Sequence, residues 1–179
     1  MKMSGVGCWR HRLRGSPLLL VGVLIHAPLA LASDFPERGM LFLNVGGLFS
    51  ETSRPEGSVP ALGAEVSLHG FVDKQVGFGV FGQWQRVLSE QSHTRFCAGP
   101  QVTYKFVGLE LGAAYERPEG LHAATASLHL APFVSYGGVL TASLRMDVPL
   151  WHKAGDTPGH GYDVGGVLAV KIPLPLNML

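Results

Sequence analysis

The sequence predicts an all-β fold, an antiparallel up-and-down barrel of eight strands, and three observations lead to this prediction. Apolar and polar residues alternate along eight separate segments, which is the pattern of strands with two different faces. Clusters of Gly, Pro, Ser and Asp separate the segments, and these connections are alternately long and short. No long stretch with the spacing of an amphipathic helix competes with the strands.

The chain of 179 residues opens with the features of a secretory signal peptide. Three arginines precede an apolar run over 18–29, and residues 30–32 form an A-x-A site. A membrane anchor is the alternative, but this run is shorter than the roughly 20 residues that a spanning helix needs, and Gly22, His26 and Pro28 interrupt it. We therefore expect residues 1–32 to be a cleaved signal peptide and residues 33–179 to be the barrel domain.

Composition excludes several classes of function for the barrel domain. Loss of the signal peptide removes four of the 14 Lys and Arg and none of the 13 Asp and Glu, so the formal charge falls from +1 to −3 and no nucleic-acid partner is expected. Cys97 remains alone, which excludes an intramolecular disulfide and a thiolate zinc cluster. Charged residues make up 15% of the chain, against about 25% in soluble domains. An exported, strand-patterned chain of low charge indicates the outer membrane of a Gram-negative-type bacterium.

The first three segments each combine an apolar row with a row of small or polar residues. They are 40–49, with Leu41, Leu43 and Val45 in the apolar row; 59–71, with Leu62, Ala64, Val66 and Leu68; and 76–86, with Val76, Phe78, Val80 and Trp84. The opposite rows contain Gly, Asn, Ser and Gln, together with Glu65 and His69. Because side chains alternate between the faces of a strand, each segment has one apolar and one polar face.

The fourth and fifth segments together cover 95–116 and contain a change of parity. Val102 and Tyr104 place the apolar row on even positions, whereas Leu109 and Leu111 place it on odd ones. A change within one or two residues indicates a tight hairpin turn, which we place near Phe106.

The last three segments alternate in the same way. They are 122–136, with Ala124, Ala126, Leu128, Leu130 and Val134 in the apolar row; 139–150, with Leu140, Ala142, Leu144, Met146 and Val148; and 161–174, with Tyr162, Val164, Leu168, Val170 and Ile172. The polar rows of the first two contain Ser and Thr together with His129, Arg145 and Asp147, and Asp163 and Lys171 lie in the polar row of the last.

The connections differ in length between the two ends of the predicted barrel. The longer ones cover 50–58, 87–93, 117–121 and 151–160, and the short ones cover 73–75, the region of Phe106, and 137–138. Long loops at one end and tight turns at the other are typical of transmembrane β-barrels, whose longer loops lie outside the cell. Both ends of the barrel domain are then expected on the periplasmic side.

The polar row decides which face meets water. A sheet in contact with water would carry many Lys, Glu, Asp and Arg residues in this row, but here Gly, Ala, Ser, Thr and Gln predominate. Small residues fit the interior of a narrow eight-stranded barrel. The apolar row contains no charge well inside it, and aromatic residues lie in it near strand ends, as in interfacial girdles: Trp84, Tyr104, Tyr115, Tyr136 and Tyr162. The apolar face is therefore expected to face lipid.

In this pattern and length the chain resembles the small eight-stranded outer-membrane barrels of the OmpA/OmpX-like type. The last segment resembles the closing-strand signal of that family, polar-x-Gly-x-x-apolar-x-apolar, at Asp163, Gly165, Leu168 and Val170. The resemblance implies that the partners are outer-membrane lipids and, during insertion, the barrel-assembly machinery.

Charged residues in the polar rows would be buried inside the barrel, where they need partners. We predict an interior network that fills the barrel: Glu65, Arg95, Lys105, Glu110, Glu116, Arg145 and Asp147. The hairpin at Phe106 would pair Lys105 with Glu110 near the periplasmic turn and Arg95 with Glu116 near the outer rim. Glu65, Arg145 and Asp147 would form a central group.

The function expected from these observations is a structural or surface-interaction role in the outer membrane, with a non-conducting interior, no enzymatic activity, no cofactor and no metal. The surface ligand is not identified by the sequence. Three alternatives stay open: a narrow pore for small solutes, a soluble lipocalin-like binding barrel, and a lipid-modifying enzyme of the deacylase or acyltransferase type.

Histidines and the cysteine are the candidates for chemistry. A deacylase or acyltransferase needs a His paired with a Ser, and His129 with Ser127 or His69 with Ser67 has this composition. Four further histidines are expected in or near outer loops, as exposed residues rather than metal ligands: His93, His122, His152 and His160. Cys97 is expected to face inwards as a small buried side chain.

Overall fold

The computed structural model describes residues 38–54, 57–89, 92–119, 123–153 and 161–176. The expected signal peptide and its cleavage site lie outside these residues, as do His122 and His160. Within the described part of the chain, no helix is long and apolar enough to cross a membrane.

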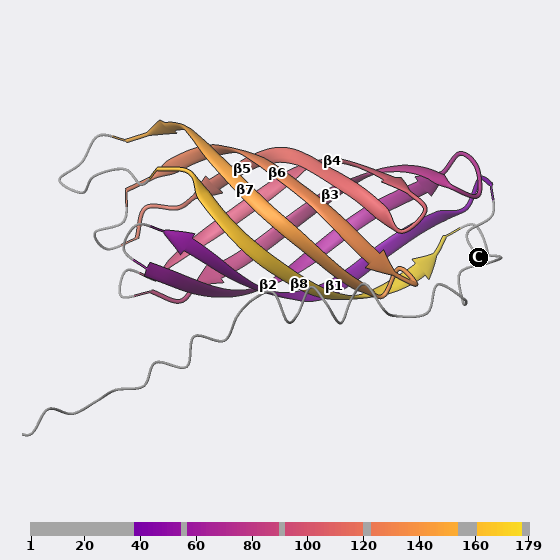
Figure 1. The fold of residues 1–179 in the computed structure, drawn as a ribbon, viewed down its shortest axis with the longest axis horizontal. Helices are drawn as coiled ribbons and strands as arrows, with labels where there is room; N and C mark the ends of the chain where they lie inside the picture. Colours follow the sequence, from indigo (N-terminus) through magenta and orange to yellow (C-terminus); the bar gives the residue numbers. More distant parts are fainter. Residues whose placement is uncertain (1–37, 55–56, 90–91, 120–122, 154–160, 177–179) are drawn as a thin grey trace, which may run out of the picture. The chain divides into compact units, whose positions relative to one another are not determined.

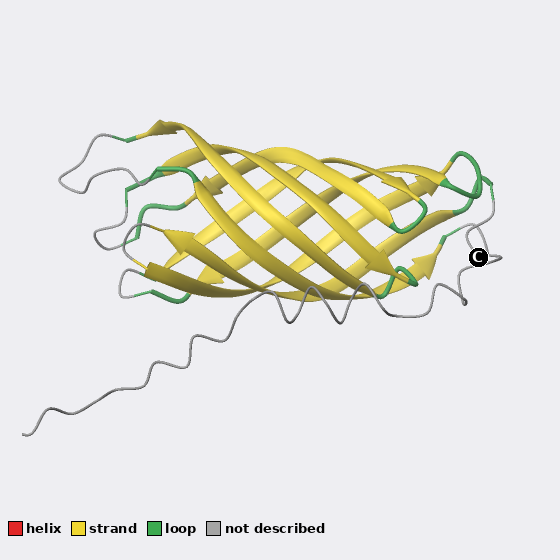
Figure 2. Cartoon of the chain, in the orientation of Figure 1, coloured by secondary structure: helices red, strands yellow, loops and turns green. Residues whose placement is uncertain are grey.

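Eight antiparallel strands form a closed barrel in which neighbours in sequence are neighbours in space (Figures 1 and 2). The strands are β1 (Leu41–Arg54), β2 (Gly57–Phe71), β3 (Val76–Val87), β4 (His93–Tyr104), β5 (Val107–Glu116), β6 (Thr125–Tyr136), β7 (Leu140–His152) and β8 (Asp163–Pro175). Pairing of β8 with β1, from Phe42↔Pro175 to Ser53↔Val164, closes the barrel. The predicted all-β, eight-stranded antiparallel barrel is confirmed.

The apolar rows lie on the outside of the barrel and the polar rows on the inside. On β2, for example, Leu62 and Val66 are about half exposed, at 53% and 48%, whereas Glu65 and Ser67 are buried at 3% and 2%. The same alternation runs along the other strands, although Ala124, just before β6, is buried. The core of this barrel is therefore its polar face.

The first long loop is much shorter than predicted. Residues 50–58 were expected to connect two strands, but β1 continues to Arg54 and β2 begins at Gly57. The two strands stay paired over this stretch, from Glu51↔Pro60 to Arg54↔Gly57. Polar residues suggested a loop, yet they continue the alternation and turn Thr52 and Arg54 inwards, where both are buried.

β7 also extends beyond its predicted end and carries a bulge there. Ala126 pairs with Trp151 and Ser127 with Pro149, so Leu150 is the extra residue. The bulge changes the parity of the strand, and Trp151 is exposed on the outer face as a result.

The tight turns lie at the end where β1 begins and β8 ends, on the right in Figure 1. Gly137 and Gly138 adopt positive φ angles of 59° and 70°, which glycine does without a steric penalty. Asp73 fixes another turn by accepting hydrogen bonds from the backbone N–H groups of Gln75 and Val76, at 2.6 and 2.7 Å. These bonds hold the pKa of the Asp73 carboxyl below its ordinary value.

Lys105 lies in the third turn and not inside the barrel. It is exposed, with a φ of 55°, and its ammonium group lies 5.6 Å from the centre of the Tyr104 ring. β4 ends at Tyr104 and β5 begins at Val107, so the parity change occupies Lys105 and Phe106 together. The prediction that Lys105 belongs to the interior network is therefore wrong, because the turn begins one residue earlier than the parity rule suggested.

Candidate functional site

The barrel interior contains a dense set of buried charged and polar side chains. Among the residues that the structure describes, nine of these are carboxylates, arginines or lysine: Arg54, Glu65, Arg95, Glu110, Glu116, Arg145, Asp147, Asp163 and Lys171. The structure thus places six of the seven residues of the expected network inside, with Lys105 as the exception. Burial of so many charges is tolerable only where each has a partner of opposite sign or a hydrogen bond.

Arg54 organises the group nearest the long loops. Its guanidinium lies 2.6 Å from a carboxylate oxygen of Glu116 and 2.8 Å from one of Asp163. His93 adds a contact of 3.3 Å between its Nε2 and the second oxygen of Glu116. His93 is therefore a buried residue at the start of β4, and the expectation that it is an exposed loop histidine is wrong.

Asp147 is the centre of the middle group. One of its oxygens accepts a hydrogen bond from Arg95 at 2.7 Å and lies 3.5 Å from Nε of Arg145. The other oxygen lies 2.7 Å from Nδ1 of His129. Arg145 also donates to the side-chain oxygens of Gln85, at 2.8 Å, and Thr52. These contacts join β1, β3, β4, β6 and β7 across the lumen.

Glu65 and Glu110 form the next group towards the turns. Lys171 makes a salt bridge with Glu65. The amide nitrogen of Gln83 lies between the two carboxylates, 3.3 Å from Glu65 and 3.2 Å from Glu110. Nε2 of His129 lies 3.7 Å from Glu110 and so connects this group to the one around Asp147.

The two expected ion pairs along the β4–β5 hairpin are not the ones that form. Arg95 is directly opposite Glu116 in the register, yet its salt bridge is to Asp147. Glu110 is opposite Gln101, and no salt bridge joins it to Lys105 among the described residues. Long side chains reach across the narrow lumen to strands that are distant in sequence, so partners on the same hairpin are a poor guide.

The two candidate His–Ser pairs do not come together as catalytic pairs. His129 directs its ring nitrogens at Asp147, Arg95 and Glu110, and no hydrogen bond to Ser127 is found among the described residues.

Nε2 of His69 is hydrogen-bonded to the hydroxyl of Thr103, at 2.8 Å, and its Nδ1 is hydrogen-bonded to the side-chain amide of Gln101, at 3.1 Å. Ser67 accepts instead from Asn44 at 3.2 Å. Both histidines are buried inside the barrel.

Sequence reasoning missed several members of the network. The sequence predicts a loop at Arg54, and it predicts Asp163 and Lys171 as polar-row residues but not as charge partners. The signal that could have identified them is the alternation itself, which places each of them in register with the inward row. Cys97 is buried at 3% as expected, and no group of three potential metal ligands occurs within the described residues.

The outer surface of the barrel is almost free of charge. At outward positions of the eight strands, among the residues described, the charged side chains are Glu51 and Arg86, each within four residues of the long-loop end of its strand. Most exposed aromatic residues of the described chain lie towards the two ends: Trp84, Phe96, Tyr115, Trp151 and Tyr162 near the long loops, and Phe78, Tyr104, Phe106 and Tyr136 near the turns. Phe49 is the exception, five residues inside the long-loop end of β1.

Comparison with known proteins does not add a relative to these findings. No protein-family model matches the chain, and no curated protein sequence is significantly similar to it.

Proposed function

We propose that this chain is an integral protein of the bacterial outer membrane, with a structural or surface-interaction role and an interior that is filled by side chains and does not conduct. The single observation that supports this proposal best is the inversion of polarity. Within the described parts of the chain, the barrel buries nine charged residues and exposes an apolar outer wall. Soluble monomeric proteins rarely expose a continuous apolar surface larger than a few hundred Å².

The dimensions of the apolar wall agree with a membrane. On β4 the outward-facing Phe96 and Tyr104 belong to the two aromatic groups and are separated by eight residues. At about 3.3 Å per residue and a tilt of about 40°, this separation is about 20 Å along the barrel axis, close to the roughly 25 Å apolar band of outer-membrane barrels. The strand number, the short turns at one end and this band support the narrower proposal of an OmpA/OmpX-like barrel.

The filled interior supports the absence of conduction. Arg145 of β7 reaches Thr52 of β1 and Gln85 of β3, and Arg95 of β4 reaches Asp147 of β7. Side chains from opposite walls therefore meet in the lumen, and eight strands leave little room beyond them. Export by the signal peptide at 1–32, and insertion by the barrel-assembly machinery, belong to the same proposal.

A charge placed on the outer wall tests the membrane location. Val80 is 57% exposed at the middle of β3, so Val80→Lys is expected to destabilise the barrel by about 2–4 kcal/mol in lipid vesicles. Ser53→Lys is the matched control, because Ser53 is exposed at the long-loop end of β1, where a charge costs about 0–1 kcal/mol. Urea titrations of the two variants in vesicles measure the difference. Equal stabilities, or a mature protein that stays in the soluble periplasmic fraction, would contradict the proposal and favour the lipocalin-like alternative.

Conductance across planar bilayers tests the filled interior separately. The inserted protein is expected to give no stable open channel, with insertion verified by heat-modifiable migration in gels. A stable, large conductance from inserted protein would overturn this part of the proposal and favour the narrow-pore alternative.

A further inference from the structure

An open recess of about 410 Å³ lies on the outer wall, across strands β3, β4 and β5. Outward-facing Gly82, Ala98 and Ala113 are neighbours in the register, and their small size makes the floor of the recess. Larger residues occupy the next outward positions along these strands on both sides, Val80, Pro100 and Leu111 towards the turns and Trp84, Phe96 and Tyr115 towards the long loops, so the wall is recessed between them. The lining is almost entirely apolar.

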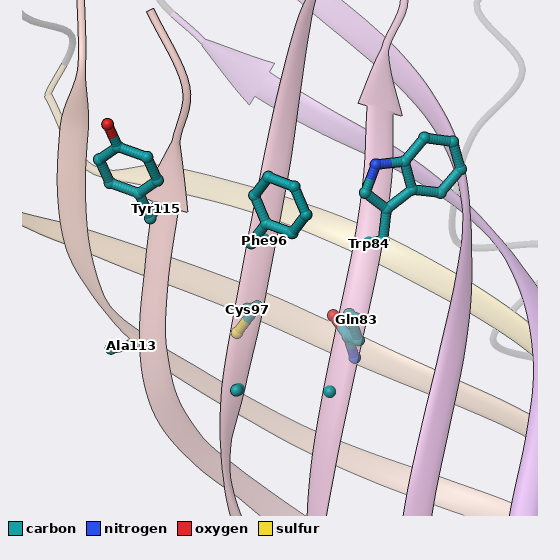
Figure 3. Close-up of a pocket in the computed structure, with 8 residues that line it drawn as sticks. Gln83, Trp84, Phe96, Cys97, Ala113 and Tyr115 are labelled. Atoms are coloured by element: carbon teal, nitrogen blue, oxygen red, sulfur yellow. The ribbon is translucent and has the colours of Figure 1, made fainter.

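Three aromatic side chains border the recess on the side of the long loops. Trp84, Phe96 and Tyr115 are consecutive partners across the three strands and are between 43% and 47% exposed. Figure 3 shows the three rings in one row above Ala113, with the Tyr115 hydroxyl directed towards the ends of the strands. Rings with a polar tip are typical of the boundary between hydrocarbon and lipid headgroups.

Two arginines lie one step further towards the loops. Arg86 is opposite Thr94 in the register, and the backbone of Arg117 donates to the carbonyl of Thr94 at 2.8 Å. Alternation puts both arginines on the same outer face as Trp84 and Tyr115. Glu119 makes a salt bridge with Arg86, which lowers the pKa of its carboxyl, whereas Arg117 is exposed and forms no salt bridge with the described residues. The three groups therefore carry one net positive charge.

We propose that this surface binds a phosphorylated lipid of the outer leaflet, with an acyl chain in the recess and its phosphate beside Arg86 and Arg117. The order of features along the strands matches the order of groups in such a lipid. The apolar recess suits an acyl chain, the aromatic row lies at the boundary with the headgroup, and the arginines lie where the phosphate would be. A second copy of the chain is a poorer occupant, because its own outer wall would bring Arg117 against another Arg117 or against apolar surface. This inference rests on the proposed membrane location.

Tryptophan quenching by brominated lipids tests the site. In a Trp151→Phe background, Trp84 is the single tryptophan of residues 33–179, and it borders the recess. The protein is folded into phosphatidylcholine vesicles that contain a minor fraction of brominated phosphatidylglycerol or, for comparison, of brominated phosphatidylcholine. We expect the anionic lipid to associate with the Trp84 site about fivefold more strongly, the factor given by one cation near an anionic surface.

Variants separate the headgroup contacts from the recess. Arg86→Gln with Arg117→Gln is expected to abolish the fivefold preference. Lys105→Gln removes one positive charge, as each arginine substitution does, but at the opposite end of the barrel. It is expected to preserve the fivefold preference. Ala113→Leu fills the recess and is expected to reduce quenching by both lipids, because it excludes the brominated chain from Trp84.

The outcomes distinguish this inference from the proposed function. Failure to insert, seen as loss of heat-modifiable migration in the same samples, contradicts the membrane location. Insertion with equal quenching by the two lipids, or with a preference that survives the double arginine variant, overturns the lipid site alone. Cross-linking of inserted protein through the β3–β5 face, with Trp84 shielded from both lipids, would overturn it by assigning the recess to a second copy.

Discussion

Replacing Asp147 by Asn changes one buried carboxylate that has three cationic or hydrogen-bonding partners. Arg95 and His129 each lie 2.7 Å from a different oxygen of Asp147, and Arg145 lies 3.5 Å from one of them. Asparagine has the same shape but keeps only one acceptor, so its NH₂ group must face either the guanidinium or the imidazole. Facing the guanidinium, the NH₂ group meets another donor; facing the imidazole, it requires His129 to give up its Nδ1 proton, so one charge-assisted hydrogen bond is lost in either orientation.

The expected loss follows from these contacts. A hydrogen bond to a charged group contributes about 1.5–3 kcal/mol, and breaking a buried ion pair from one side costs about 3–5 kcal/mol. We therefore expect Asp147→Asn to lower the free energy of unfolding by about 3 kcal/mol, which is more than a hundredfold in the equilibrium constant.

Urea titration of the protein in micelles or vesicles measures this change, with folded and unfolded forms separated by their gel migration. Glu51→Gln is the matched control, because Glu51 is exposed on the outer face. This substitution is expected to change the free energy of unfolding by less than about 0.5 kcal/mol. An Asp147→Asn barrel that unfolds at the same urea concentration as Glu51→Gln would refute the reasoning. If Asp147→Asn does not fold, Arg95→Met with Asp147→Leu should recover folding, because it removes both members of the ion pair, while Arg145 keeps its bonds to Gln85 and Thr52 and His129 keeps its contact with Glu110. Failure of both would refute the view that unpaired charge is the cause.

Three further predictions concern the backbone and the cysteine. A Cβ at Gly99 would collide with the carbonyl oxygen of Leu111, so Gly99→Ala should abolish folding or shift the urea midpoint strongly, whereas Gly166→Ala, which meets open space, should leave it unchanged. Lys105→Gly should raise the free energy of unfolding by up to about 1 kcal/mol in urea titrations, because glycine adopts the positive φ of that turn without strain; a loss of stability would contradict this. The Cys97 thiol should resist a water-soluble thiol reagent until the barrel unfolds, and rapid labelling of folded protein would show that water reaches the lumen.

Strand order and the assignment of faces could be predicted from the sequence because they depend on local alternation. The parity change near Phe106 located the β4–β5 hairpin to within one residue, and the small polar row identified the interior. These are properties of single strands and turns, and each strand of a barrel repeats the same rule.

Partners inside the barrel could not be predicted in the same way. Arg54 continues the inward row of β1 beyond a stretch rich in Ser and Thr, and its partners Glu116 and Asp163 lie on β5 and β8. Contact across the lumen depends on the tilt and stagger of all eight strands together, which no single segment encodes. The shortening of the first loop is of the same kind, because pairing with β2 decides where β1 ends.

The buried charges restrict the order in which the barrel can assemble. Arg54 on the first strand and Asp163 on the last are 109 residues apart, yet they lie 2.8 Å from each other once the barrel is closed. A sheet that entered the bilayer before β8 met β1 would carry Arg54, Glu65 and Arg95 into hydrocarbon without all of their partners, at a cost of several kcal/mol for each. For the membrane barrel proposed above, closure of the β1–β8 seam and passage into lipid are therefore expected to be one coupled event, with the Arg54–Asp163 bond among the last to form.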